Sequence, residues 1–138
     1  MRNNLYWSNG GLRRGPTPGE DRILAHHCPY EVDMYGFSHE QLDCYRLALE
    51  VARWMKQARF PRGDSDLKDQ GVRASRSTVL NLAEGKARGG GAERNHYRIA
   101  LGSAAEACAT LDMVDLPGTA DQQRKLRRVG AMLAKMAR

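Results

Sequence analysis

Glu93 and His96 have a spacing that metal chemistry uses in helical proteins. A Glu-x-x-His pair on each of two helices, with further inward-facing glutamates, holds the metals of carboxylate-bridged di-iron bundles. The sequence contains no second Glu-x-x-His pair, and Glu84 and Glu106 do not complete a matching array. The pattern therefore does not predict a metal centre.

The sequence also does not predict three other kinds of site. Gly85-Lys86 suggests a phosphate-binding loop, but Ala87 follows where serine or threonine is needed, and no first glycine stands in register. His26-His27-Cys28 are adjacent residues, which cannot all face one ion without a fourth ligand. No arrangement of serine, cysteine, histidine and aspartate indicates a nucleophile with its base. We expect no catalytic residues, no cofactor and no metal, and hence a protein that is not an enzyme.

The cysteines and the hydropathy indicate the class of protein. Cys28, Cys44 and Cys108 are odd in number and widely spaced, which suggests neither a disulfide framework nor a Cys-x-x-Cys metal site. The sequence shows no signal peptide and no apolar run near 18 residues. We expect a cytoplasmic protein with reduced thiols and no association with membranes.

The first 36 residues differ in composition from the rest. Ser8-Asn9-Gly10-Gly11 and Gly15-Pro16-Thr17-Pro18-Gly19 are clusters typical of turns and linkers. Apart from a short apolar patch, Ile23-Leu24-Ala25, the segment lacks sustained periodicity. We expect residues 1–36 to form a flexible N-terminal arm and residues 37–138 to form one domain.

Apolar residues at spacings of three and four predict helices across that domain. The first is expected from Ser38 to Phe60-Pro61, the second from Asp64 or Ser65 to Glu84, the third over 92–116, and the fourth from Thr119. Ser38 with Gln41, and Thr119 with Gln122, have the spacing of capping boxes, and Gly85 has the chemistry of a helix stop. Four amphipathic helices with short connections predict an all-α fold, an antiparallel up-and-down four-helix bundle.

The apolar stripes identify the expected core. They comprise Cys44, Tyr45, Ala48, Val51, Ala52 and Met55; Leu67, Ala74, Thr78 and Leu82 with Gly71; Tyr97, Ala100, Leu101, Ala104, Ala107, Cys108, Leu111 and Val114; and Leu126, Val129, Leu133 and Met136.

The positive charge is concentrated near the C-terminal end of the sequence. Residues 117–138 contain six basic side chains against Asp121 alone, whereas residues 1–37 are balanced. A concentrated basic face is typical of proteins that bind polyanions, although such a face can also serve only to keep a protein soluble. The side chains expected to contact nucleic acid are Lys86, Arg88, Arg94, Arg98, Arg124, Lys125, Arg127, Arg128 and Lys135.

The central stretch also carries two motifs of a known family. These are Asn81-Leu82-Ala83-Glu84-Gly85 and Ala100-Leu101-Gly102-Ser103, supported by Leu67, Gln70, Arg73-Ala74, Ser77, Arg88, Glu93, Tyr97, Ile99 and Ala105-Glu106. Over residues 37–116 the sequence resembles the four-helix-bundle proteins encoded within 23S rRNA intervening sequences. These are structurally related to the accessory (Avd) proteins of diversity-generating retroelements. Gly71 and Thr78 depart from the larger aliphatic residues usual in that family.

The resemblance implies a left-handed antiparallel bundle that assembles into a homo-oligomeric ring, a pentamer. It implies no settled biochemical function. In the related retroelement proteins a positive surface is associated with nucleic acid and with a reverse transcriptase, so RNA or DNA and a reverse transcriptase are the partners expected by analogy alone. The alternative to nucleic-acid binding is a protein-interaction scaffold, or an accessory subunit of a reverse transcriptase that makes no direct contact with nucleic acid.

Two roles remain open for the shared polar residues. They could cross-link the second and third helices through hydrogen bonds, which we favour, or Asn81, Glu84, Arg88 and Glu93 could form an exposed ligand site around the turn.

Overall fold

The computed structural model describes residues 5–8, 11–14 and 36–138. It divides into two units, Met1–Tyr35 and Gly36–Arg138. In the first unit, strands β1 (Leu5–Ser8) and β2 (Gly11–Arg14) pair in antiparallel register, with Trp7 opposite Leu12. This hairpin was not expected within the predicted flexible arm. The Ile23-Leu24-Ala25 patch and His26-His27-Cys28 lie outside the described residues.

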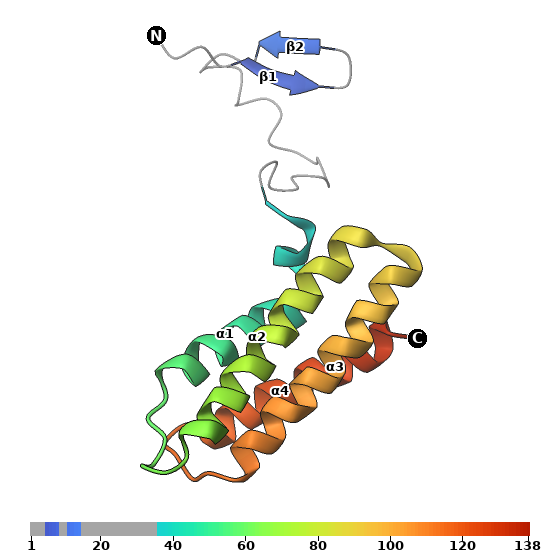
Figure 1. Ribbon diagram of the computed structural model, residues 1–138. Coiled ribbons are helices and arrows are strands. Elements are labelled where there is room, and N and C mark those ends of the chain that lie inside the picture. Colours follow the sequence, from blue (N-terminus) through green and yellow to red (C-terminus); the bar gives the residue numbers. More distant parts are fainter. Residues whose placement is uncertain (1–4, 9–10, 15–35) are drawn as a thin grey trace. The chain divides into compact units, whose positions relative to one another are not determined.

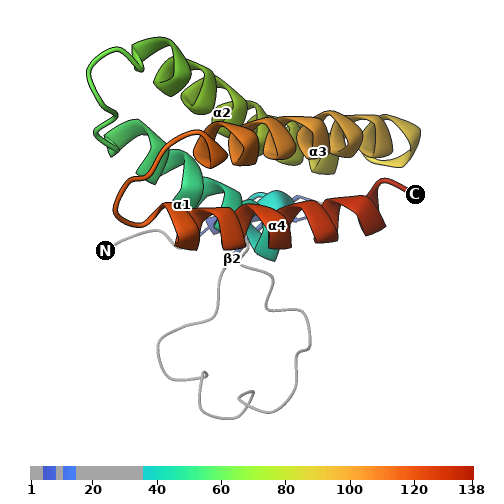
Figure 2. The same cartoon turned by 90° about the horizontal axis from the view of Figure 1, so that it is seen from below.

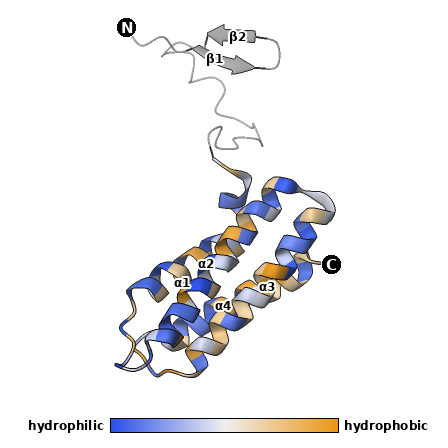
Figure 3. Cartoon of the chain, viewed as in Figure 1, coloured by the Kyte–Doolittle hydropathy of each residue, from blue (hydrophilic) through white to orange (hydrophobic). Residues whose placement is uncertain are grey.

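The second unit is a four-helix bundle, as predicted. A 3₁₀ turn, Ser38–Gln41, precedes helix α1 (Asp43–Gln57), which is followed by α2 (Ser65–Arg88), α3 (Gly90–Asp112) and α4 (Thr119–Met136). Each helix runs antiparallel to the next, and α1 also packs on α4, which closes the bundle (Figure 1). Hydropathy alternates along the helices, as amphipathic segments require (Figure 3).

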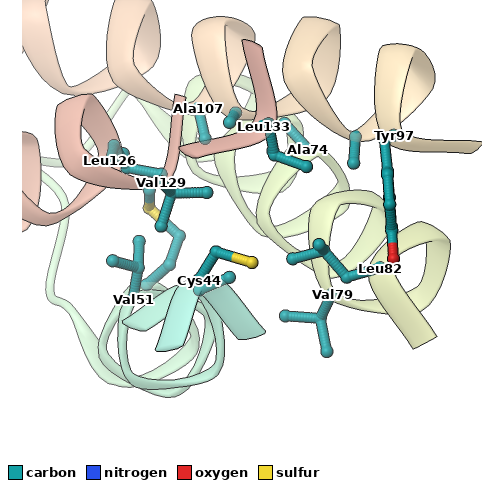
Figure 4. Packing of buried hydrophobic residues seen from close by; sticks show 14 of the residues in the cluster. Cys44, Val51, Ala74, Val79, Leu82, Tyr97, Ala107, Leu126, Val129 and Leu133 are labelled. Carbon is teal, nitrogen blue, oxygen red and sulfur yellow. The ribbon is translucent and has the colours of Figure 1, made fainter. Parts of the chain in front are cut away.

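The interior contains the predicted stripes together with buried residues outside them, among them Ser75, Val79 and Thr110. Val51, Met55, Leu82, Val129 and Leu133 are fully buried, and the small residues of α3 allow α2 and α4 to approach it closely (Figure 4). The partly buried members of the stripes lie at the margin of the core: Tyr45, Ala52, Leu67, Leu101, Cys108, Val114 and Met136. Within the described ranges, every helix is too short or too polar to cross a lipid bilayer.

Both predicted capping boxes are wrong. Ser38 begins a 3₁₀ turn rather than α1. The N-cap residues are Phe37 for this turn and Leu42 for α1, and neither makes a capping hydrogen bond with its side chain. At α4 the N-cap is Gly118, whose φ of 90° is left-handed and suits glycine. Thr119 Oγ1 instead accepts a hydrogen bond from the Leu116 amide at 3.3 Å.

The prediction that α2 stops at Gly85 is also wrong. The helix continues one turn further, to Arg88, and ends at Gly89, which has the positive φ of 70°. Gly85 is buried inside α2, where a β-carbon would lie 3.0 Å from the His96 Cβ and 3.2 Å from the Glu93 carbonyl oxygen. Glycine is needed here because α3 approaches the α2 backbone closely, not because the helix ends.

Candidate nucleic-acid interface

Hydrogen bonds join α2 to α3 along the solvent-facing side of their contact. Gln70 donates to the Glu106 carboxylate, and the hydroxyl groups of Ser77 and Ser103 share a hydrogen bond of 2.8 Å. Nearer the turn, His96 Nδ1 lies 2.9 Å from Asn81 Oδ1. These pairs fix the register of the two helices, so the predicted cross-link is present.

The polar residues of the turn are also engaged with one another. Arg88 Nη2 lies 2.7 Å from Glu84 Oε1, one helical turn away. Lys86 Nζ lies 3.7 Å from Glu93 Oε1, and the same oxygen accepts a hydrogen bond of 2.6 Å from the hydroxyl of Tyr97. The carboxylates of the turn are thus used within the fold, which supports a structural role for them over a ligand site.

Glu93 and His96, the pair with metal-ligand spacing, point to different partners. Glu93 contacts Lys86 and Tyr97, whereas His96 lies between Asn81 and Glu84, with its Nε2 3.8 Å from the Glu84 carboxylate. Across the described ranges, no group of three or more His, Cys, Asp and Glu side chains is placed to hold a metal ion.

Tyr97 is the buried ionisable group of this region, only 2% exposed. Burial, together with the hydrogen bond to the Glu93 carboxylate, raises the pKa of the Tyr97 hydroxyl well above its ordinary value of 10.0. The folded protein therefore holds this proton more tightly than the unfolded chain. The stability from this linkage is complete below about pH 10 and is lost as the pH rises further.

We expect Tyr97→Phe to lower the free energy of unfolding at pH 7 by about 1–3 kcal/mol, because it removes a hydrogen bond to a charged acceptor. The difference from the parent protein should narrow above pH 10, where only the parent has this proton to lose. Urea unfolding of both proteins at pH 7 and pH 10.5 measures the effect. A difference that stays constant across this interval would contradict the assigned pKa direction.

On α4, the predicted cations divide into paired and unpaired side chains. Lys125 Nζ lies 2.9 Å from Glu50 Oε2 on α1 and 3.1 Å from Asp121 Oδ2, while Arg124 Nη2 lies 3.1 Å from Asp121 Oδ1. The ion pairs with Glu50 and then Asp121 raise the pKa of the Lys125 ammonium. The hydrogen bonds and positive charges of Lys125 and then Arg124 lower the pKa of the Asp121 carboxyl. Arg124 and Lys125 therefore serve contacts within the bundle.

The remaining predicted cations are exposed. In the described part of the chain, no carboxylate lies within ion-pair distance of them; they are Arg94, Arg98, Arg127, Arg128 and Lys135. Arg127 lines a groove of about 350 Å³ between α3 and α4, beside Cys108 and Asp112. Burial and the nearby Asp112 carboxylate raise the pKa of the Cys108 thiol, which keeps it protonated.

Arg138 belongs with these cations and was not among the predicted contact residues. It lines a second hollow between α3 and α4, together with Arg94. The spacing of eleven from Arg127 to Arg138 is three helical turns, which could have shown that the two side chains share one side of the fourth helix; the structure shows that this side faces α3. We refer to Arg94, Arg98, Arg127, Arg128, Lys135 and Arg138 as the α3–α4 basic face.

The segment that forms the four-helix bundle matches a known protein family. The model of the 23S rRNA-intervening sequence protein family matches residues 40–135, which cover all four helices of the bundle almost to their ends. The chain belongs to the 23S rRNA-intervening sequence protein family. No curated protein matches the sequence at a significant level. The family match spans the α2–α3 cross-links and most of the α3–α4 basic face, and it excludes the β1–β2 hairpin.

Proposed function

We propose that this protein is a non-enzymatic, cytoplasmic nucleic-acid-binding protein, which contacts RNA or DNA through the α3–α4 basic face. The observation that carries the proposal is the set of unpaired, exposed cations on α3 and α4, set against the ion-paired Arg124 and Lys125. Guanidinium and ammonium groups free of carboxylates can replace the counterions of a phosphate backbone, and such contacts read little sequence.

A titration of the full chain with a structured RNA tests this proposal. Affinity should fall steeply between 50 and 200 mM salt, with a log–log slope of about −0.7 to −0.9 for each phosphate contacted. A parallel titration with a duplex DNA of equal length shows which of the two nucleic acids the protein binds more tightly. No detectable binding of either at 50 mM salt would overturn the proposal.

We further propose that the protein acts as a homo-oligomer, a pentameric ring, which is the assembly that the sequence resemblance implies. Leu80 on α2 is 61% exposed and Ile99 on α3 is 44% exposed. Leu80 follows Ser77 by three residues, and Ile99 precedes Ser103 by four. Both therefore flank the Ser77–Ser103 hydrogen bond on the outer side of the α2–α3 helix pair. This apolar surface supports self-association, and a ring would repeat each basic face and add avidity.

The second candidate function is a protein-interaction scaffold, including an accessory subunit of a reverse transcriptase. The same exposed Leu80 and Ile99 favour it, since such side chains can serve a partner protein instead of a second copy. The nucleic-acid titration separates the two functions. If the protein forms an oligomer but binds neither RNA nor DNA, the scaffold function is the one supported.

A further inference from the structure

A hollow of about 360 Å³ lies where the α2–α3 turn meets the end of α4. Figure 2 shows the end of α4 and the α2–α3 turn at the same end of the bundle. Its walls come from three helices, with Lys86 from α2, Arg94 and Tyr97 from α3, and Arg138 just after α4.

The lining of this hollow carries excess positive charge. Lys86, Arg94 and Arg138 contribute three cations, against one carboxylate, Glu93. That carboxylate is already engaged, because its Oε1 faces both the Lys86 ammonium and the Tyr97 hydroxyl. In the described part of the chain, no carboxylate lies within ion-pair distance of Arg94 or Arg138. The side chains of the lining therefore carry a net charge close to +2.

The backbone adds hydrogen-bond donors at the same place. Helix α3 begins at Gly90, and its first-turn amide groups have no acceptor within the helix. Nη2 of Arg94 lies 3.9 Å from the position that a β-carbon on Gly91 would occupy, so the guanidinium lies over this first turn. Gly90 lines the hollow and has no side chain to cover its backbone, and the Arg94 guanidinium lies beside Gly91. A phosphate can accept hydrogen bonds from the first-turn amide groups and from the Arg94 guanidinium.

We propose that this hollow binds a phosphomonoester dianion. The dianion matches the net side-chain charge of about +2, and the three cations come from α2, from α3 and from the residue that follows the C-cap of α4. A terminal phosphate fits such a concave site because only one of its oxygens carries a substituent. The ligand is the terminal phosphate of a nucleic-acid strand or free inorganic phosphate, and the strand-end source rests on the proposed function.

Inorganic phosphate, titrated at constant ionic strength against the ¹⁵N-labelled full chain, tests the site directly. The Gly90 and Gly91 amide resonances should shift and saturate, while chloride should not shift them. Arg94→Gln should weaken binding by about 10-fold, taking one charge-assisted contact as about 1.5 kcal/mol. Arg76→Gln, which removes an exposed cation from α2 outside the hollow, should leave the affinity unchanged.

Glu93→Gln gives a prediction of opposite sign. It removes the one negative charge of the lining and should tighten phosphate binding, whereas a structural disturbance would weaken it. Shifts that do not saturate, or equal affinities for the Arg94→Gln and Arg76→Gln variants, would overturn the site.

Two short RNAs of one sequence, one with a 5′-phosphate and one with a 5′-hydroxyl group, identify the source of the phosphate. Tighter binding of the phosphorylated strand, lost in Arg94→Gln, supports a strand-end site. Equal binding of the two strands overturns that source. If inorganic phosphate saturates the hollow while neither RNA binds, the site stands and the proposed function fails. If both RNAs bind without saturation by phosphate, the site fails and the proposed function stands.

Discussion

Gly85→Val is expected to lower the free energy of unfolding by about 1–3 kcal/mol, through overpacking between α2 and α3. A β-carbon at this position would lie 3.0 Å from the His96 Cβ, 3.1 Å from the Tyr97 ring and 3.2 Å from the Glu93 carbonyl oxygen. The last of these is backbone, so the clash cannot be relieved by a side-chain rotation. One helix must move away from the other, and the hydrogen bond of Asn81 with His96 lies next to the point of separation.

Gly102→Val is the matched control. Gly102 is also in a helix interior, in α3, but nothing lies within 4 Å of the place where its β-carbon would be. Because valine and glycine differ little in helix propensity, this change should alter stability by only a few tenths of a kcal/mol. Thermal unfolding resolves the pair, since 1 kcal/mol shifts the midpoint of a domain of this size by about 4–8 °C. Equal midpoints for the two variants would show that Gly85 is not a contact point.

The double variant Arg127→Gln/Arg128→Gln is expected to weaken RNA binding on the order of 30-fold at 0.1 M salt. Each lost phosphate contact removes about 0.7–0.9 from the log–log salt slope. At 0.1 M salt this corresponds to about a 5- to 8-fold loss of affinity, taking 1 M salt as the reference. Both side chains are exposed, and within the described ranges neither lies within ion-pair distance of a carboxylate. The folded domain should therefore keep its stability.

Arg73→Gln/Arg76→Gln removes the same formal charge from the exposed side of α2 and serves as its control. This pair lies outside the α3–α4 basic face, so affinity should fall by no more than the few-fold effect of a lower net charge. Equal losses in the two double variants would mean that binding depends on net charge alone and not on this face.

The sequence was sufficient to predict the bundle because apolar periodicity reports directly on burial. The fully buried Val51, Leu82, Val129 and Leu133 all fall on the predicted stripes. Helix ends were harder to predict. Gly85 looks like a stop because glycine lowers helix propensity by about 1 kcal/mol, and only the neighbouring α3 shows why the helix continues.

The hairpin carries a local signal that composition concealed. Asn9-Gly10 stands between Leu5–Ser8 and Gly11–Arg14, and this dipeptide favours the tight turns of two-residue hairpins. The surrounding glycines and prolines led instead to the expectation of a flexible arm, because they dominate the average over 1–36.

The candidate site shows which parts of an interface the sequence can supply. The Glu84–Arg88 ion pair has helical spacing and is readable from the sequence, whereas the Lys125–Glu50 pair joins α4 to α1 and depends on the fold. The sequence therefore identifies the cations, but only the structure shows which of them are free of ion pairs. The helical spacing from Arg127 relates Arg138 to the other cations of α4, but its place beside Arg94 of α3 depends on the packed bundle.

The salt dependence of RNA binding, measured for the parent protein and for Arg127→Gln/Arg128→Gln in the same buffers, tests the central claim most directly. The claim is that unpaired cations of the α3–α4 basic face contact phosphates. It predicts a log–log slope for the double variant that is shallower by about 1.4–1.8. Parallel lines, or a parent protein that binds no RNA at low salt, would contradict it.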